Sequence, residues 1–244
     1  NAGSIEARGS STGDTRAIAV SVEQGANLPT IRNSGSIKAV ATGEGGNAIA
    51  IRDTGGTVSL IENAGQISAS GAKKGSGRNI AIDLSARTAG ATVRQTQVAS
   101  GHAAPSIVGN VLFGSGNDLL ELADGGLSGD VSFGAGNDTL SLGGDAVHAG
   151  NVSFGTGTSA MNLLGSSAFG GTADFGGGSG TLSLSGTSIF SGGIANGGNV
   201  AVTVAGGTLD LSKPTSIASL SVGATGMLVA TLDKAAGSGT GIDV

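Results

Sequence analysis

The fold is decided by a nonapeptide that recurs through the second half of the chain, Asn110-Val111-Leu112-Phe113-Gly114-Ser115-Gly116-Asn117-Asp118. A copy of the same length stands at 130–138 and keeps the Val, the Phe, both glycines and the final Asn-Asp, and shorter copies follow at 151–157 and 172–176. The phenylalanines of these copies, Phe113, Phe133, Phe154 and Phe175, are 20, 21 and 21 residues apart. Each phenylalanine precedes a glycine-rich corner and then a short alternating segment such as Leu120-Glu121-Leu122. A repeat of constant length with this internal pattern indicates one supersecondary unit per repeat.

A longer repeat occupies the first half of the chain. Asn1-Ala2-Gly3-Ser4-Ile5-Glu6-Ala7 returns at 33–39 and at 63–69, at spacings of 32 and 30 residues. A second apolar row at 17–20, 48–51 and 79–82 keeps step with it. Each unit therefore holds at least two short strands with alternating side chains.

Both repeats predict an all-β fold, a right-handed parallel β-helix of about ten coils with one coil per repeat. Glycines would supply the corners at positive φ, and successive coils would lie about 4.8 Å apart. Equivalent residues then stack, so we expect a ladder of the four phenylalanines and a ladder of the aliphatic residues. Antiparallel hairpins or propeller blades would need a hairpin turn such as Asn-Gly in each unit and repeats nearer about 40 residues, and Asn196-Gly197 is the only Asn-Gly in the sequence.

Composition agrees with a thin solenoid core. The 244 residues include 48 Gly, 3 Pro, 6 Phe, no Trp, no Tyr and no Cys, without a G-X-Y period, which excludes collagen. A hydrophobic content of 38% with Ile, Val and Leu at fixed spacings excludes a disordered chain. The absence of cysteine excludes disulfides and Cys-ligated metal or redox centres.

The repeats divide the chain into four expected parts. We predict coils of about 30 residues over 1–85, an irregular coil or protruding loop over 86–109, coils of about 21 residues over 110–194, and C-terminal coils over 195–244. The chain starts inside a repeat, so we expect it to be a fragment or a processed product.

Charge is unevenly distributed between the two halves. Residues 1–109 carry 10 Lys/Arg and 7 Asp/Glu, and residues 110–244 carry 2 and 10. A basic stripe interleaved with aromatic residues is lacking, which argues against nucleic acid as a partner. The basic cluster of Lys73, Lys74, Arg78, Arg87 and Arg94 is either a solvated face or a contact for an acidic partner.

The C-terminal stretch resembles the passenger domains of bacterial autotransporters. Gly206-Gly207-Thr208-Leu209-Asp210-Leu211-Ser212, followed by the segment 220–230, is similar to the G-G-T-L-x-L…L-x-V-x-x-x-G-x-L pattern near the end of such passengers. The resemblance implies export across the inner membrane and translocation through an outer-membrane β-barrel encoded outside this chain. It implies a cell-surface or secreted location outside a Gram-negative outer membrane, with residues 195–235 as the segment where folding starts.

Asp118 and Asp138 are the candidate metal ligands. Their corners resemble the calcium-binding nonapeptide G-G-x-G-x-D-x-L-x, in which carboxylates and turn carbonyls supply oxygen ligands. The period here is about twenty residues and not nine, and later coils have Thr158-Ser159 and Ser179-Gly180 at these positions. One interpretation is that the two stacked carboxylates share a calcium ion. The other is that Asn and Asp tolerate the corner conformation and hydrogen-bond their own backbone.

No other cofactor and no catalytic residue is predicted. Sugar-cleaving β-helices need paired carboxylates beside aromatic side chains that hold the sugar. The chain has no Trp and no Tyr to form such platforms. The close acid and base groups, Asp83 with Arg78 and Arg87, and Arg52 with Asp53, are expected as weak ion pairs on solvated faces. His102 and His148 lie in no catalytic motif.

The function predicted from these observations is a non-catalytic surface rod that acts in adhesion or self-association, with host or neighbouring-cell molecules or other copies as partners. The first alternative is a stalk that presents a separate upstream domain. The second is a polysaccharide-cleaving β-helix enzyme.

Overall fold

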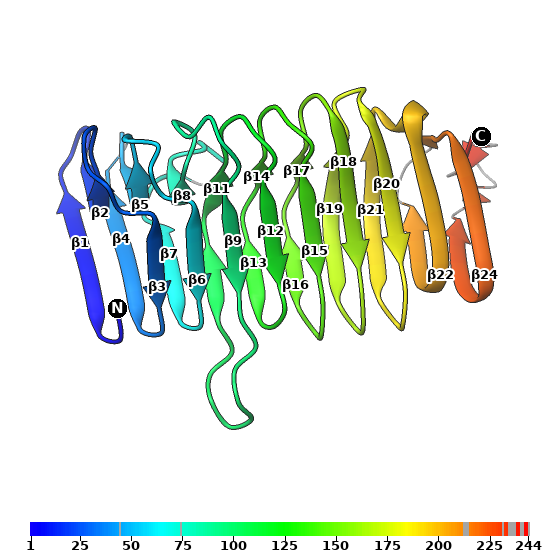
Figure 1. The fold of residues 1–244 in the computed structure, drawn as a ribbon, viewed down its shortest axis with the longest axis horizontal. Coiled ribbons are helices and arrows are strands. Elements are labelled where there is room, and N and C mark those ends of the chain that lie inside the picture. Colours follow the sequence, from blue (N-terminus) through cyan, green and yellow to red (C-terminus); the bar gives the residue numbers. More distant parts are fainter. Residues whose placement is uncertain are drawn as a thin grey trace.

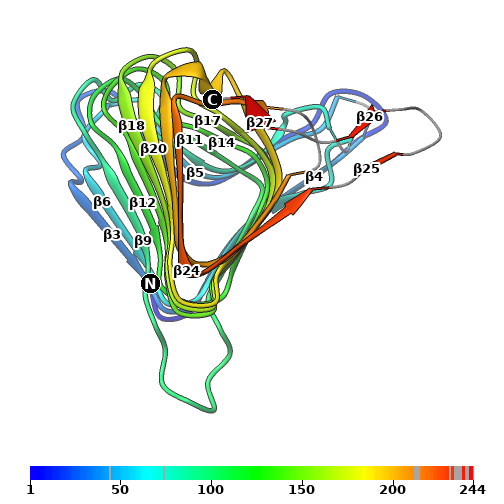
Figure 2. The same cartoon turned by 90° about the vertical axis from the view of Figure 1, so that its right-hand side faces the viewer.

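The computed structural model describes residues 1–43, 45–73, 75–211 and 215–230, and the backbone of three short strands beyond them. The strands lie side by side in parallel pairs along one long axis, from β1 at one end to β24 near the other (Figure 1). Viewed along that axis, each coil is a triangle with three strand-bearing sides (Figure 2). The predicted right-handed parallel β-helix is confirmed.

We call the three sides faces A, B and C. Face A consists of β1 (Ser4–Ser10), β4 (Ser36–Thr42), β7 (Gln66–Ser70), β10 (Ser106–Val108), β13 (Gly126–Ser128), β16 (Val147–Ala149), the first halves of β19 (Ala168–Asp174) and β21 (Ile189–Ala195), and the second halves of β22 (Val200–Leu211) and β24 (Ser219–Ala230). Face B consists of β2 (Arg16–Val22), β5 (Asn47–Asp53), β8 (Asn79–Asp83), β11 (Asn110–Leu112), β14 (Val131–Ser132), β17 (Val152–Ser153) and the second halves of β19 and β21.

Face C consists of β3 (Thr30–Asn33), β6 (Leu60–Asn63), β9 (Thr92–Gln95), β12 (Leu119–Leu122), β15 (Thr139–Leu142), β18 (Thr158–Leu163), β20 (Ser179–Leu184) and the first halves of β22 and β24. The remaining elements are a short 3₁₀-helix, η1 (Gly197–Asn199), and the strands β23 (Thr215–Ser216), β25 (Leu232–Asp233), β26 (Ser238–Gly239) and β27 (Ile242–Asp243).

Equivalent residues of neighbouring coils stack in the interior, except at the two terminal coils of the face A row, where Ile5 is half-buried and Leu228 is 40% exposed. On face A the strand register joins one residue from each of ten coils: Ile5, Ile37, Ile67, Ile107, Leu127, His148, Phe169, Phe190, Leu209 and Leu228. This row confirms the expected number of coils. It also shows that a single interior position accepts isoleucine, leucine, histidine and phenylalanine.

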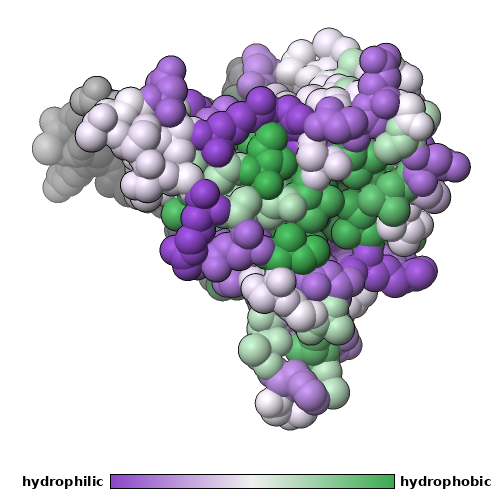
Figure 3. Space-filling model, turned by 90° about the vertical axis from the view of Figure 1, so that its left-hand side faces the viewer, coloured by the Kyte–Doolittle hydropathy of each residue, from purple (hydrophilic) through white to green (hydrophobic). Residues whose placement is uncertain are grey.

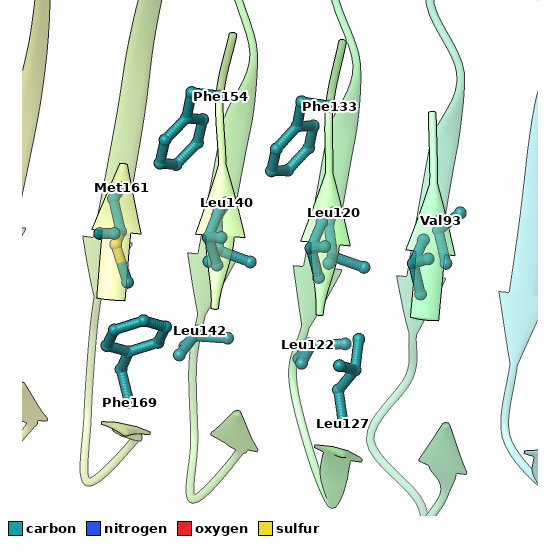
Figure 4. Packing of buried hydrophobic residues seen from close by; sticks show 14 of the residues in the cluster. Val93, Leu120, Leu122, Leu127, Phe133, Leu140, Leu142, Phe154, Met161 and Phe169 are labelled. Carbon is teal, nitrogen blue, oxygen red and sulfur yellow. The ribbon is translucent and has the colours of Figure 1, made fainter. Parts of the chain in front are cut away.

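The predicted phenylalanine ladder is confirmed. The rings of Phe113, Phe133, Phe154 and Phe175 stack with centroid distances of 5.0, 5.1 and 4.9 Å. Figure 4 shows Phe133 and Phe154 in this row beside the leucine rows of face C. The glycine after each phenylalanine is required by the same close stacking, since a Cβ at Gly155 would lie 1.6 Å from the Gly134 carbonyl oxygen.

The longer N-terminal coils extend beyond the triangular body that all coils share, and we call this extension the N-terminal flange. Beyond the triangular body, the ends of the face A strands approach the starts of the face B strands. A cluster of alanines from β2, β4, β5 and β7 fills the space between them: Ala17, Ala39, Ala41, Ala48 and Ala69. Figure 2 shows these N-terminal coils reaching to the right of the triangle. A small side chain suits so narrow a space, which explains the alanine that ends each N-x-G-x-I-x-A copy, at Ala7, Ala39 and Ala69.

A polar ladder runs inside the N-terminal coils. Asn1 Nδ2 donates to Asn33 Oδ1 (2.9 Å), Asn33 Nδ2 to Asn63 Oδ1 (2.9 Å), and Asn63 Nδ2 to Gln95 Oε1 (3.2 Å). Gln95 Nε2 then donates to the Asp124 carbonyl at 2.8 Å. From the next coil onward the same position is Leu122, Leu142, Leu163 and Leu184. The repeated Asn-x-Gly thus holds successive corners together through side-chain amides.

Residues 86–109 contain both regular and irregular structure. β9 and β10 lie in the stack, whereas residues 96–105 between them project from the rod (Figure 1). The projecting loop is tied to the next coil by the Val98 N–H, which donates to Asp124 Oδ2 at 3.1 Å.

Apolar residues reach the surface at the N-terminal end of the rod (Figure 3). Figure 3 looks onto the N-terminal end and shows a small apolar area framed by hydrophilic residues. Ile5, Ala19 and Val20 contribute to the packing against the core there.

Candidate functional site

Asp118 and Asp138 lie in the corners that connect face B to face C, and both point into the rod. Their side chains are almost fully buried, with 3% and 1% of the residue surface exposed. Asp118 Oδ1 accepts a hydrogen bond from the Ala91 N–H at 2.6 Å, and Asp138 Oδ1 accepts one from the Asp118 N–H at 2.9 Å. Each carboxylate therefore caps the backbone of the preceding coil.

The two residues stack one coil apart, as the repeat predicts. The expectation that such aspartates hydrogen-bond their own backbone is wrong for both residues, because the inward corner position brings the backbone of the neighbouring coil closer. They also do not turn outward into water. In each residue the second oxygen, Oδ2, is buried and has no hydrogen-bond partner.

Burial changes the acidity of both groups. Removal from water raises the pKa of Asp118 to about 6, and the negative charge of Asp138 acts in the same direction. Burial also raises the pKa of Asp138. A carboxyl with an unpartnered buried oxygen favours a proton or a cation.

The chemistry of the corner fits a calcium ion only in part. The two Oδ2 atoms are hard oxygen donors, but Ca²⁺ takes about six to eight oxygen ligands, so carbonyl groups would have to supply most of them. Within the described residues no group of three or more His, Asp or Glu side chains is placed to hold one ion. Calcium at Asp118 and Asp138 therefore stays a prediction, tested below.

The acid and base clusters expected on solvated faces are arranged differently. Asp53 is buried and accepts from the Val58 N–H at 2.7 Å, so its predicted solvated position is wrong. Arg52, on the opposite side of the same strand, pairs instead with Glu23 at 2.6 Å. Successive residues of a strand point to opposite sides, which separates this pair.

Asp83 and Arg87 each form hydrogen bonds with groups other than one another. Asp83 Oδ1 accepts from the Ser85 hydroxyl at 2.6 Å. Arg87 donates to the carbonyls of Gly90 and Gly56, both at 3.0 Å. The basic cluster is dispersed too, since Arg94 lies on face C while Lys73 precedes β8, and Lys74 lies outside the described residues.

The two histidines have different surroundings. His148 is fully buried in the interior row of face A, edge-on to Phe169 with ring centroids 5.4 Å apart. Its Nε2 donates to the Gly129 carbonyl at 3.0 Å, and its Nδ1 has no partner. His102 lies in the projecting loop and lines a groove of about 720 Å³ between that loop and the corners at Gly35 and Gly65.

Face C carries an ordered set of outward side chains that the sequence analysis missed. In four consecutive coils one outward position holds Arg32, Glu62, Arg94 and Glu121, with alternating sign. Arg32 pairs with Glu62 at 2.5 Å and Arg94 with Glu121 at 2.7 Å. The signal was present, because Arg32 and Glu62 each precede the repeated asparagine by one residue.

In the later coils, the equivalent outward positions of face C hold uncharged side chains. In the next five coils the same outward position holds Ser141, Asn162, Ser183, Thr203 and Ser221. The neighbouring outward row is Thr139, Ala160, Thr181, Ala201 and Ser219. Face C is thus a flat strip with a charged half and a neutral hydroxyl-rich half.

The other shallow hollows are polar. A groove of about 600 Å³ is lined by residues of the long N-terminal coils, such as Ala69 and Asn79, and of the short coils, among them Gly109, Gly129 and Gly150. A second hollow of about 470 Å³ continues along face B and shares Asn110 and Asp130 with it. Both line the side of the rod, and neither reaches the Asp118 corner.

None of the described residues belongs to a helix long and apolar enough to cross a membrane. Comparison of the chain with known protein families, with curated proteins and with solved structures found no match.

Proposed function

We propose that the chain is a non-catalytic rod, displayed on the outside of a Gram-negative cell as an autotransporter passenger, that acts in adhesion or self-association through its sides. The location rests on the resemblance of residues 206–212 and 220–230 to autotransporter passengers, and the observation that carries the adhesive role is face C. Its nine stacked strands form a side surface roughly 40 Å long at about 4.8 Å per coil. A surface of that kind suits many weak lateral contacts rather than one deep pocket.

The stacking of the interior supports the same role. Each coil packs on its neighbours through continuous apolar rows, so the rod holds its outward rows in a fixed register. Most side chains in the outward rows of face C are short hydroxyls, amides or paired charges, and Leu60, Leu119, Ala160 and Ala201 are the apolar members. The polar groups form hydrogen bonds and ion pairs that are individually weak and become effective when many act together.

Cells that express the complete reading frame test the proposal. Protease added outside the cells should remove the rod, and the cells should clump or attach to a surface more than cells in which residues 110–194 are deleted in frame. An epitope tag on both proteins controls for equal display. A rod that is displayed but changes neither clumping nor attachment would contradict the adhesive role, and a rod that external protease never reaches would contradict its location.

A further inference from the structure

The alternating charges on face C form a row that is complementary to itself. We call Arg32, Glu62, Arg94 and Glu121 the charge ladder. The strand pairing places them in four consecutive coils at the same outward position. The signs along the rod are therefore plus, minus, plus and minus.

The ion pairs within the chain use only some of the hydrogen-bonding atoms of the charge ladder. Arg32 and Arg94 each donate through Nε to one oxygen of the following glutamate. Among the described residues, the terminal guanidinium nitrogens of Arg32 and Arg94 and the Oε1 atoms of Glu62 and Glu121 make no hydrogen bond. The arginine side chains are 72% and 43% exposed, so these groups are open to a second molecule.

The order of signs selects one orientation for a second copy. If two copies meet through face C with a two-fold axis parallel to the strands and between β6 and β9, Arg32 faces Glu121 of the second copy and Glu62 faces its Arg94. Two parallel copies in register would set each charge against its equal. An antiparallel pair shifted by one coil would set Glu62 against Glu62. A parallel pair shifted by one coil would form three opposite pairs and leave Arg32 of one copy and Glu121 of the other unpaired. Opposite charges attract and like charges repel, so only the first arrangement pairs all four charges of each copy.

We propose that the charge ladder is a self-association surface, at which a second copy of this chain docks antiparallel through face C. The neighbouring outward row, Thr30, Leu60, Thr92 and Leu119, is neutral and adds no repulsion in this arrangement. The proposal deepens the proposed function and rests on it for the place where copies meet.

The contact is small, which sets its strength. Four coils about 4.8 Å apart with four-residue strands give a patch of roughly 250 Å² per copy, against about 800 Å² in a standard stable interface. Soluble copies should therefore associate weakly, and salt should reduce the association because exposed charges are screened. Many copies on facing surfaces would bind far more strongly than one pair.

Charge reversal tests the pairing in the purified chain. Glu62→Arg and Arg94→Glu each place two like pairs in the proposed dimer, and each variant alone should associate about tenfold less than the original chain, measured by sedimentation across a concentration series. An equal mixture of the two variants restores every opposite pair, so association should return. Lys38→Glu reverses a charge of similar exposure on face A and should leave association unchanged. Circular dichroism of each variant verifies that the rod is folded.

Cysteine cross-linking tests the orientation, and the chain has no cysteine of its own. Thr30→Cys and Leu119→Cys keep the charge ladder intact and face each other only in the antiparallel pair. A mixture of these two variants should cross-link faster than either alone. Cross-linking of Thr30→Cys mainly with itself, or an original chain whose association is absent or insensitive to salt, would overturn the proposal.

The two proposals fail in different ways. If the mixed reversal variants restore association in solution but the rod does not make cells clump or attach, the charge ladder stands and the adhesive role fails. If cells clump equally with the original chain and with Arg94→Glu, the adhesive role stands and the charge ladder is not its contact.

Discussion

At the scale of single residues, the interior of the rod holds one histidine, His148, in a row of face A whose other members are all apolar. His148 occupies the position taken by Leu127 in the coil before it and by Phe169 in the coil after it. Its burial lowers the pKa of the imidazole, against the smaller opposing effects of the Gly129 carbonyl and the Asp130 charge. The neutral ring is compatible with the ladder, and the charged ring is not.

His148 should therefore make the rod sensitive to acid. Because the folded pKa lies below the unfolded value of about 6.5, the unfolded chain binds the proton first, and stability falls as pH decreases from that value toward the folded pKa. The loss approaches about 1.4 kcal/mol per pH unit. Melting temperatures between pH 7 and 5 should decrease less in His148→Leu than in the original chain.

His102 supplies the control for this experiment. It lies in the projecting loop, so His102→Leu should keep the pH dependence of the original chain. Equal slopes for the original chain and His148→Leu would show that the buried ring does not carry the acid response.

Asp118 and Asp138 allow a decision on calcium. If their Oδ2 atoms share an ion, calcium should raise the melting temperature, chelation should lower it, and Asp138→Asn should abolish both effects, since an amide binds Ca²⁺ less strongly than a carboxylate. Asp145→Asn, a change at an exposed acid of the same coil, should leave the response unchanged. A melt unaffected by calcium in the original chain would leave backbone capping as the role of both residues.

At the scale of elements, the long and the short coils place different residues at the inward position that ends each strand of face C. The long coils hold the end of face C with a chain of buried amides, and the short coils put leucine there. An amide ladder is stable only when every member is paired, because an unpaired buried polar group costs about 1–3 kcal/mol.

Among the amides of this ladder, Asn63 is fully buried and bonds to both neighbouring coils, so its replacement should remove several hydrogen bonds. It accepts from Asn33, and donates to Gln95 and to the Gly65 carbonyl. Asn63→Leu should lower the free energy of unfolding by about 2–4 kcal/mol, measured with denaturant, although leucine suits the equivalent position of later coils. Asn162→Leu, on the outer side of face C, should change it by less than about 0.5 kcal/mol. Equal effects of the two substitutions would argue against the ladder.

At the scale of the whole molecule, the rod is close to one-dimensional, since each coil contacts mainly its two neighbours. A loop that leaves the stack between two strands should therefore change the free energy of unfolding little, provided that the strands on either side keep their register. The projecting loop leaves the stack in this way, because residues 96–105 separate Gln95 from Ser106, whereas only Ala64 and Gly65 separate the equivalent strands β6 and β7.

Replacement of residues 96–105 by Ala-Gly should therefore leave the rod intact. We expect a single cooperative thermal transition within a few degrees of the original, because the loop contributes nothing to the continuous core. The same replacement in a coil, for example of residues 131–140, removes buried strands and serves as the contrasting variant. A large loss of stability on loop replacement would show that the groove beside His102 is part of the folding unit.

Much of the architecture was predictable because a solenoid converts sequence period directly into structure. The spacing of the phenylalanines and of Asn-x-Gly was enough to predict coils, parallel stacking and the Phe113 to Phe175 ladder. The burial of Asp118, Asp138 and Asp53 continues the in-and-out alternation of the strand that each adjoins, so it could have been read from the pattern. What the pattern could not give is the partner of each carboxylate, which is a backbone N–H that only the folded chain brings close.

The charge ladder shows the same limit. Arg32 and Glu62 are 30 residues apart, but Arg94 and Glu121 are 27 apart across a projecting loop, so neither period aligns all four. Sequence alone determined that this chain winds into coils, because its apolar residues and glycines recur at a period that only stacked coils satisfy. Tertiary structure decided which polar side chains meet across coils, because that depends on the register of strands after loops of unequal length have left the stack and returned.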